Sequence, residues 1–494
     1  MTERWFAGRP LGVLLVVVLV VSGTVVVEPV RANGSDIQSG TIDTFGSNAW
    51  AFNDMAQNSS GTIHQVNIDE NDRITVRAWD GSAWSVVTSF TAGEVTDVTV
   101  DSLSNDLSLD IDAQDHLHLT YRGSIGSGVD NTRGVLYGEY DGSSWTHSWV
   151  ESATHPNGWN NFDDPLLVVE NDGTPHLQYE FSGESTNDIR YATPDGAGGW
   201  TIETIVSTDG SGTDEVFTEA VDVDNTGTVH MWYTREDDQN TYTGNVYHTT
   251  RPSGSSWSSP TKVLDSTGDG IDYEFGGALV ADGDQHLVYS YTEWDADWNV
   301  VNSEIRHVSD ETGSMQDTLV DQSTSRSLVA LGVATTTQGA HDVYVMADSS
   351  NADWTVVHQQ FYGRNADDQW VDGTDLSFTS NSIGEMVFEV NPSGELVTVT
   401  EGTNLRNVYY KAGPVSAFVP VPNDPPAFDT ASPTLSVDED SGATSIDSLL
   451  AATDTEGGST LTWSVASTPS NGTLGGFDAT ASTGTGVAPS GLTY

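Results

Sequence analysis

Apolar and polar residues alternate in short runs along most of the chain, and turn residues separate these runs. The stretch 107–145 shows the pattern clearly. Apolar side chains stand at every second position over 107–111, 117–121 and 135–137, and a further run begins at Trp145. Because successive side chains of a strand point to opposite faces of a sheet, this period of two predicts a meander of four antiparallel strands.

The same unit repeats through the chain. A histidine marks the second run of six copies, and Val397 takes its place in a seventh: His64, His118, His176, His230, His286 and His341. Neighbouring marks are 54 to 58 residues apart. A tryptophan opens the fourth run in five copies, at Trp84, Trp145, Trp200, Trp257 and Trp370. A fixed period with four short strands per copy predicts an all-β protein, a seven-bladed β-propeller whose blades pack against their neighbours.

The two ends of the repeat suggest how the ring closes. Residues 33–46 precede the first copy and contain the strand-like run Gly40-Thr41-Ile42-Asp43-Thr44-Phe45. The seventh copy lacks a tryptophan-led fourth run. We therefore expect the N-terminal strand to complete the last blade, in a propeller spanning 33–420 that is a monomer.

Residues 1–32 have the features of a signal peptide. Arg4 and Arg9 precede an apolar stretch over 11–27, and Val30-Arg31-Ala32 provides a small-x-small cleavage site. The alternative is an uncleaved anchor, which would be the chain's contact with a membrane, because 17 apolar or small residues lie at the lower edge of what spans a bilayer. In both cases we expect a secreted or cell-surface protein.

The charge of the chain limits the classes of partner that it can bind. There are 72 acidic residues against 16 basic ones, a net charge of −56, and there is no cysteine. The lack of cysteine excludes disulfides and thiolate chemistry, and the scarcity of Lys and Arg argues against nucleic acid as a partner. Such self-repulsion needs screening by counterions and favours a halophilic source, with an ordinary acidic secreted protein as the alternative.

The C-terminal part differs in composition. Prolines over 420–426 predict a stiff hinge, and the chain beyond it is rich in Ser, Thr, Ala, Gly and Asp. Four segments stand out: NDPPAF (423–428), VDED (437–440), ATDTEGG (452–458) and SNGTL (470–474). They resemble the cadherin-like, immunoglobulin-type tandem repeats of bacterial and archaeal surface proteins. The resemblance implies a β-sandwich over 421–494 that is partial, because further strands of that family follow the point at which this chain stops.

The same resemblance implies a calcium site. In cadherin-like domains a glutamate after the first strand and an Asp-x-Asp/Glu motif ligate calcium between successive domains. Those roles fall here on Glu439, Asp454 and Glu456, with Asp424 in the linker motif. The alternative is a solvated acidic edge in an already acidic protein.

Repeated polar residues within the propeller allow a structural and a functional interpretation. Histidine is a common acid-base group and metal ligand, but one histidine per blade is better explained by a repeated hydrogen bond to a neighbouring turn. Tryptophans at strand starts favour packing between blades, with sugar-stacking platforms as the alternative. The Asp-rich segments 110–115 and 222–227 offer oxygens that calcium would need, although turn-forming Asp, Asn and Gly explain them without an ion.

Asp-Gly turns precede three of the tryptophans, at Asp80-Gly81, Asp141-Gly142 and Asp195-Gly196. They loosely resemble the BNR or Asp-box repeats of bacterial propellers. The Asp-box pattern is Ser-x-Asp-x-Gly-x-x-Trp, whereas Asp and Gly are adjacent here. The resemblance therefore supports the fold and transfers no catalytic residue.

Enzyme chemistry would be found among residues that break the repeat. The candidates are His155, His248, His307, Arg190, Arg235, Arg306, Glu180 and Glu293. The loops 151–164 and 293–302 are rich in Trp, Asn and Asp, as a sugar-binding face could be. No Arg-Ile-Pro segment of a sialidase, phosphate loop or zinc-helix motif occurs in the sequence. Catalytic residues stay unassigned at this point.

Two hypotheses of function remain. The first is a non-enzymatic adhesion protein, in which the propeller binds a glycan or a cell-surface protein and calcium-stiffened repeats form a stalk. The alternative is an extracellular glycan hydrolase or polysaccharide lyase with its site in the propeller loops. Aromatic residues spread over several blades would favour binding, whereas two carboxylates in one pocket, or a His/Tyr pair with an arginine, would favour catalysis.

Overall fold

A computed structural model describes most of the repeat region and short parts of the C-terminal region. The described residues are 37–44, 54–127, 131–154, 161–209, 214–236, 245–265, 272–281, 283–295, 297, 299–336, 341–350, 357–365, 368–376, 383–402, 407–419, 427–428, 435, 442–453, 460–462, 473–475, 480–482 and 493–494. Residues Ala32–Pro420 form one compact unit, and residues 421–494 belong to another.

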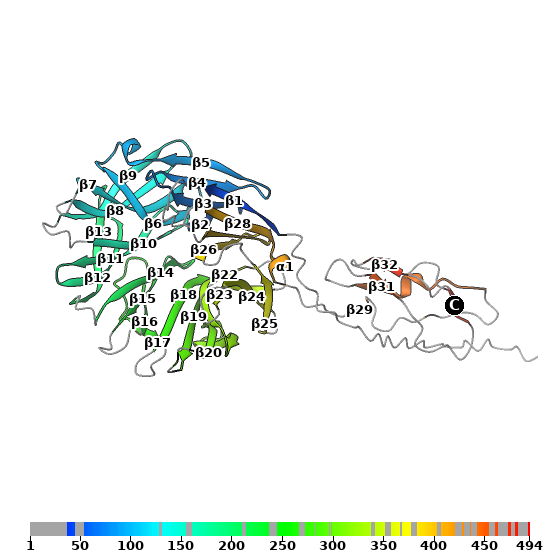
Figure 1. Ribbon diagram of the computed structural model, residues 1–494. Coiled ribbons are helices and arrows are strands. Elements are labelled where there is room, and N and C mark those ends of the chain that lie inside the picture. The colour runs from blue at the N-terminus through cyan, green and yellow to red at the C-terminus, as the bar shows by residue number, and fades with distance from the viewer. Residues whose placement is uncertain are drawn as a thin grey trace, which may run out of the picture. The chain divides into compact units, whose positions relative to one another are not determined.

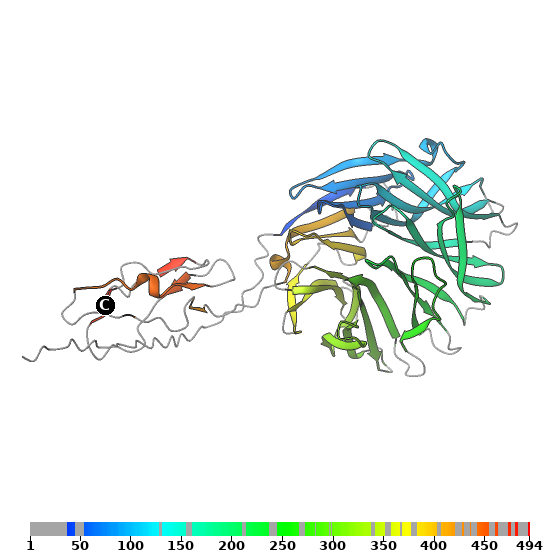
Figure 2. The ribbon, with the colours of Figure 1, turned by 180° about the vertical axis from the view of Figure 1, so that it is seen from behind.

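Seven four-stranded antiparallel sheets are arranged as the blades of a ring (Figure 1), and Figure 2 shows the same ring from behind. The predicted seven-bladed β-propeller is confirmed. In blades 1 to 6 the first strand in sequence lines the centre, and the later strands follow outward. In blade 7 the innermost strand is β26 (Ile383–Val390).

The blades are built as follows. Blade 1 has β2 (Asp54–Gln57), β3 (Ile63–Ile68), β4 (Ile74–Trp79) and β5 (Trp84–Phe90). Blade 2 has β6 (Ser102–Ile111), β7 (Leu117–Ile125), β8 (Thr132–Tyr140) and β9 (Trp145–Thr154). Blade 3 has β10 (Asn161–Val169), β11 (Pro175–Gly183), β12 (Thr186–Pro194) and β13 (Trp200–Thr208). Blade 4 has β14 (Val216–Val223), β15 (Val229–Arg235), β16 (Asn245–Arg251) and β17 (Thr261–Leu264). Blade 5 has β18 (Asp272–Ala281), β19 (Asp284–Trp294), β20 (Val300–Ser309) and β21 (Gln316–Ser323). Blade 6 has β22 (Ser327–Thr335), β23 (His341–Ser350), β24 (Val357–Asn365) and β25 (Trp370–Asp375). Blade 7 has β26 (Ile383–Val390), β27 (Glu395–Gly402) and β28 (Asn407–Pro414), completed by β1 (Gln38–Thr44). A 3-10 turn, η2 (Ala92–Glu94), follows β5, and a short helix, α1 (Val415–Phe418), follows β28.

The ring closes as the sequence predicts. Strand β1 pairs antiparallel with β28 and becomes the outermost strand of blade 7. The carboxylate of Asp43 in β1 also accepts a hydrogen bond from the guanidinium of Arg77 in β4. The N-terminal strand therefore joins the last blade to the first.

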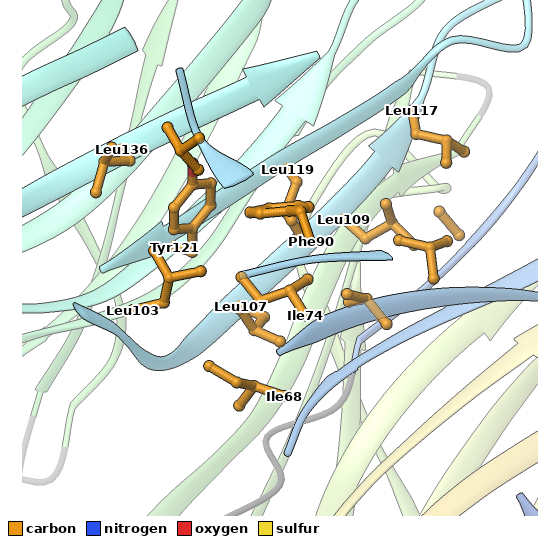
Figure 3. Packing of buried hydrophobic residues seen from close by; sticks show 14 of the residues in the cluster. Ile68, Ile74, Phe90, Leu103, Leu107, Leu109, Leu117, Leu119, Tyr121 and Leu136 are labelled. Atoms are coloured by element: carbon orange, nitrogen blue, oxygen red, sulfur yellow. The ribbon is translucent and has the colours of Figure 1, made fainter. Parts of the chain in front are cut away.

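Hydrophobic side chains fill the space between neighbouring blades. Figure 3 shows Ile68 and Ile74 of blade 1 in one cluster with Leu107, Leu119 and Tyr121 of blade 2. All five of these side chains are at most 8% exposed. Blade 2 also packs against blade 3, because Val135 and Tyr137 lie in a second cluster with Leu177 and Tyr179. Apolar side chains therefore lie on both faces of this sheet, as expected when blades cover one another.

The repeated tryptophans pack between blades, which confirms the structural interpretation for the two that are best defined by contacts. The Trp145 indole lies 5.0 Å from the Phe90 ring of the preceding blade, and its N–H donates to Thr88 Oγ1 at 2.9 Å. The Trp200 N–H donates to Ser148 Oγ of its preceding blade at 3.1 Å. These indoles are therefore committed to blade packing and are not free sugar platforms.

The repeated histidines are buried structural groups. His176 shows the arrangement, since its Nε2 lies 2.9 Å from Glu170 Oε1 in the preceding turn and its Nδ1 lies 2.6 Å from the Tyr191 hydroxyl. His118 likewise lies 3.4 Å from Asp112 in its turn and shares a hydrogen bond with Tyr137. Burial lowers the pKa of both histidines. The predicted hydrogen bond to a neighbouring turn is present at His176, and His118 lies beside the acid of its turn.

The sixth histidine needs a correction. In blade 2, His118 pairs across the sheet with Asp110, which is one residue before the end of the innermost strand. The equivalent position of blade 6 is Tyr344, which pairs with Ala334, and His341 lies three residues earlier in β23. Strand β23 begins before the position that the other blades use, so the spacing of histidines alone misplaces the register.

The C-terminal unit is described in short pieces. Strand β29 (Ala427–Phe428) pairs with β30 (Ala452–Thr453), and β31 (Thr460–Thr462) pairs with β32 (Thr480–Ser482). A 3-10 turn, η3 (Asp447–Leu449), precedes β30. A cadherin-like sandwich stays a prediction, and so does the signal peptide, because residues 1–36 lie outside the described part. None of the helices among the described residues is long and apolar enough to cross a membrane.

Candidate functional site

The innermost strands of the seven blades surround a cavity of about 890 Å³. Seven carboxylate residues line it: Asp54, Asp106, Asp110, Asp164, Glu219, Asp222 and Glu389. Among the described residues that line this cavity, none is Lys, Arg or His. We call it the central cavity. Its walls alternate these acids with aliphatic residues of the strands.

Three of the carboxylates stand on irregularities of successive innermost strands. The pairing of β6 with β7 shifts around Asp106, that of β10 with β11 shifts around Asp164, and that of β14 with β15 shifts at Glu219. Asp106 and Asp164 have φ values of 66° and 45°, in the left-handed region that residues other than glycine seldom adopt. Bulges of this kind redirect a side chain and are over-represented beside active sites.

Blades 5 and 6 carry other residues at this bulge, and in blade 7 the register shift of β26 spans Gly384 and Glu385. In β18 the shift falls at Gly276, where a Cβ atom would lie 2.7 Å from the backbone of Ala330, and in β22 it falls at Leu331. Blades 2, 3 and 4 each place an acid of the central cavity at the bulge, and blades 5 and 6 do not. We call Asp106, Asp164 and Glu219 the bulge carboxylates.

Arg122 of β7 lies among these acids. Its guanidinium pairs with the Asp106 carboxylate, lies 2.7 Å from Asp163 Oδ1, and donates to Asn161 Oδ1 at 3.2 Å. One cation thus offsets two carboxylates, and it holds Asp106 in a fixed orientation because Arg donates in a planar fork.

The pKa values of two bulge carboxylates, Glu219 and Asp164, differ. Burial raises the pKa of Glu219 to about 8, and the nearby charge of Asp164 adds to the rise. Desolvation, with the charges of Asp106 and Asp163, raises the pKa of Asp164 to about 6. Near neutral pH the pair therefore holds one proton on Glu219 while Asp164 is mostly ionised. In enzymes, a carboxyl group that stays protonated can act as the acid and an ionised neighbour as the base, and such differences in environment set the two roles.

Glu180 of β11 is a further acid beside the cluster. Its Oε1 accepts a hydrogen bond from the Thr218 N–H at 3.0 Å, next to Glu219 in the chain. Burial, followed by the charge of Asp164, raises the pKa of Glu180 to about 8. Glu180 is 5% exposed and does not line the cavity, so it supports the β14 bulge from behind.

Further along the innermost strands, three acids join one blade to the next. Asp54 accepts from the Leu109 N–H at 2.7 Å, Asp110 from the Val169 N–H at 2.7 Å, and Asp222 from the Val280 N–H at 2.6 Å. Each of the three also accepts from the N–H of the residue that follows it. Burial raises their pKa values to about 6, 7 and 6, respectively.

Several candidates taken from the sequence have structural partners instead. His248 and His307 lie 3.1 and 3.2 Å from the repeated His230 and His286, and burial lowers the pKa of each to about 3. Arg235 forms an ion pair with Asp214 at 2.8 Å.

Two more arginines from that set are also bound within the fold. Arg306 pairs with Glu304 at 2.7 Å and with Asp317 at 2.8 Å. Arg190 pairs with Asp188 at 2.8 Å and with Glu151. Among the unrepeated candidates, Glu180 lies beside the bulge carboxylates. Glu293 pairs with Asn302 across β19 and β20. His155 lies outside the described residues.

The predicted metal ligands cannot be compared with the geometry of the propeller. Asp424, Glu439, Asp454 and Glu456 all lie outside the described residues, so calcium in the C-terminal part stays a prediction. Within the described part of the chain, no group of three or more His, Cys, Asp or Glu side chains is arranged to hold a metal ion.

The Asp-rich turns of the propeller use their carboxylates locally. Asp112 Oδ1 accepts from the N–H groups of Gln114 and His116. Asp224 Oδ1 does the same for Thr226 and Thr228. These are turn-forming contacts, as the structural interpretation of the sequence expects.

Sequence reasoning missed the bulge carboxylates, although a signal exists. They precede the in-phase histidines His118 and His176 by 12 residues and His230 by 11. No run of strand-like alternation marks them, because the bulge interrupts the alternation at that point.

No family model matches the chain, and no curated protein matches it in sequence. Several solved structures are similar in fold. An alpha-L-arabinanase of Penicillium chrysogenum, solved with arabinobiose, shares 14% identity at a TM-score of 0.42, over 63% of this chain and 93% of that one. A polysaccharide lyase named PL25 ulvan lyase shares 12% at 0.48, over 75% and 93%. A fucose-specific lectin of Aleuria aurantia shares 12% at 0.37, over 68% and 97%. Similarity at this level transfers no residue role to the present chain.

Proposed function

We propose that this propeller is an extracellular glycan hydrolase, with the bulge carboxylates at the centre of its active site. The observation that carries the proposal is the delivery of Asp106, Asp164 and Glu219 to one cavity by bulges of three successive blades. A residue repeated for folding would recur in all blades, whereas the bulges of blades 5 and 6 carry no acid.

The proposed mechanism divides the work between two carboxyl groups. Glu219, protonated near neutral pH, donates its proton to the leaving oxygen as the glycosidic C–O bond breaks. Asp164, ionised, acts on the anomeric carbon directly or takes a proton from the water that attacks this carbon. Asp106, held by Arg122, adds negative charge near the positive charge that develops on the sugar ring.

The hydrolase is favoured over the other two hypotheses by specific contacts. A lyase of the kind expected from the sequence pairs His with Tyr, and the pairs His118–Tyr137 and His176–Tyr191 are buried inside blades. An adhesion site built on the repeated tryptophans is disfavoured because Trp145 and Trp200 are used in blade packing. Binding without turnover remains the outcome that would overturn the proposal.

A screen for new reducing ends tests it. The purified full chain is incubated with a panel of neutral and charged polysaccharides in buffer of high salt, and both reducing ends and unsaturated products are measured. We expect reducing ends without unsaturated products. Glu219→Gln and Asp164→Asn should each lower the rate about 100-fold or more with binding retained.

A matched control is Glu203→Gln, which makes the same chemical change on the outer strand β13, where Glu203 pairs with Arg251. It should leave the rate within about two-fold of the unaltered protein. Binding of a glycan with no product at any pH, or unsaturated products, would contradict a hydrolase.

A further inference from the structure

The charge of the central cavity bears on which glycans can enter it. Seven acids line it, and among its described lining residues there is no cation. Arg122, which pairs with the bulge carboxylate Asp106, also pairs with Asp163 and donates to Asn161. An anionic sugar that enters would therefore meet several carboxylates and no unpaired guanidinium.

The acids of the central cavity already repel one another enough to raise the pKa values of some of them. Glu389 has a pKa raised to about 8 by burial and then by the charges of Asp54 and Asp110. Glu219 is likewise kept protonated near neutral pH, by burial and by the nearby charge of Asp164. The same burial and the same ionised neighbours that keep these two carboxyl groups neutral would also act against the charge of an anionic ligand. Like charges in a poorly solvated site repel strongly, so the cavity provides no stabilisation for a further anion.

We propose that the substrate of this site is a glycan that carries no carboxylate or sulfate groups, so that uronic-acid and sulfated polysaccharides are excluded by charge. This inference rests on the proposed function, which it narrows to one substrate class. Hydroxyl groups of a neutral sugar can donate hydrogen bonds to the lining carboxylates, and each such bond is charge-assisted.

Pairs of polymers with the same backbone provide the test. We suggest hydroxyethyl cellulose with carboxymethyl cellulose, dextran with dextran sulfate, and methyl-esterified with de-esterified polygalacturonan. Affinity electrophoresis of the full chain measures binding, and reducing ends measure cleavage, both at about 0.1 M and 2 M salt. In every pair that is bound, the uncharged member should bind at least ten-fold more tightly at 0.1 M salt.

The net charge of the whole chain would also repel polyanions, so a variant must separate the two effects. Glu219→Gln with Asp164→Asn removes two cavity acids and should reduce the preference for the uncharged member several-fold. The control Asp372→Asn removes an acid from β25, the outermost strand of blade 6, and should leave the preference unchanged. Equal effects of the two changes would assign the preference to overall charge and overturn the inference.

The outcomes for the two proposals differ. Cleavage of the anionic member as fast as the uncharged one would overturn the substrate class and leave the hydrolase standing. Selective binding of uncharged members without cleavage would overturn the hydrolase and support the charge selection. If no member of any pair is bound, both proposals fail.

Discussion

The Asp110 carboxylate of β6 accepts a hydrogen bond from the Val169 N–H of β10 at 2.7 Å, and so ties the innermost strand of blade 2 to that of blade 3. Asp54 and Asp222 make the same bond to their next blades. The innermost strand of a blade has a free edge toward the centre, and these acids satisfy part of it. The ring is therefore held by polar contacts at its centre as well as by apolar packing between blades.

We predict that Asp110→Ala lowers the free energy of unfolding by about 1–3 kcal/mol, because the Val169 and Ile111 N–H groups lose their acceptor. Asp110→Asn keeps one acceptor oxygen and should cost less. Urea denaturation measures both. The control Asp372→Ala, on the outer strand β25, should stay within about 0.5 kcal/mol, and a loss at Asp110 no larger than this would refute the role.

Stability should depend on pH with a maximum between about pH 4 and pH 6.5. Asp54 and Glu389 have pKa values raised to about 6 and about 8, so the folded chain retains protons that the unfolded chain releases from about pH 4 upward. Their destabilising effect therefore grows as the pH rises through that window. His147 and His248, with pKa values lowered to about 4 and about 3, act oppositely, and stability is lost as the pH falls below about 6.5.

Thermal unfolding from pH 4 to 9 checks this dependence. Glu389→Gln should raise Tm at pH 9 by about 3 °C or more and change it little at pH 6, since the glutamate is already neutral there. An equal shift at both pH values would show that Glu389 does not titrate as described.

The histidine pairs inside blades 4 and 5 should accept the tyrosine that blades 2 and 3 use. His307 bonds His286 at the position where Tyr137 bonds His118 and Tyr191 bonds His176. We expect His307→Tyr to change the free energy of unfolding by less than about 1.5 kcal/mol, and His307→Leu to cost about 1–3 kcal/mol because His286 loses its partner. Chemical denaturation of both variants decides, and a reversed order would exclude the hydrogen bond as the reason for the pairing.

Ring closure by β1 should be worth several kcal/mol. Deleting residues 33–46 exposes the edge of β28 and removes the Asp43 partner of Arg77. We expect a loss of about 2–4 kcal/mol, and Asp43→Ala alone should cost about 1–3 kcal/mol because the Arg77 side chain is only 11% exposed. Hydrogen exchange should show faster exchange in β28 after the deletion, and unchanged protection there would contradict closure by this strand.

If the propeller is a hydrolase, its activity should rise and fall with pH between two limits. The base Asp164 must be ionised, which sets an acidic limb near pH 6, and the acid Glu219 must be protonated, which sets a basic limb near pH 8. Arg122→Met removes the cation that lowers the pKa of Asp164 and should move the acidic limb upward. Measured kcat/KM over pH 4–10 tests this, and an unmoved limb in Arg122→Met would remove Asp164 from the role of base.

Much of the propeller could be predicted from the sequence. Seven copies, four strands per copy, the closing role of residues 38–44 and the packing role of Trp145 and Trp200 all follow from local alternation and its period. The register of blade 6 could not be predicted, because a mark such as His341 fixes a position along the chain and not its partner across the sheet. Tyr344 takes that position because β23 starts earlier than the equivalent strands.

The sequence by itself determined the fold class, since the period-two alternation and its recurrence near every 55 residues are properties of the chain alone. Tertiary structure decided which acids meet. Asp106, Asp164 and Glu219 are more than 50 residues apart from one another, and they come together because bulges in three blades turn them toward one axis. Their protonation is decided there as well, because burial and like charge exist only once the ring has closed.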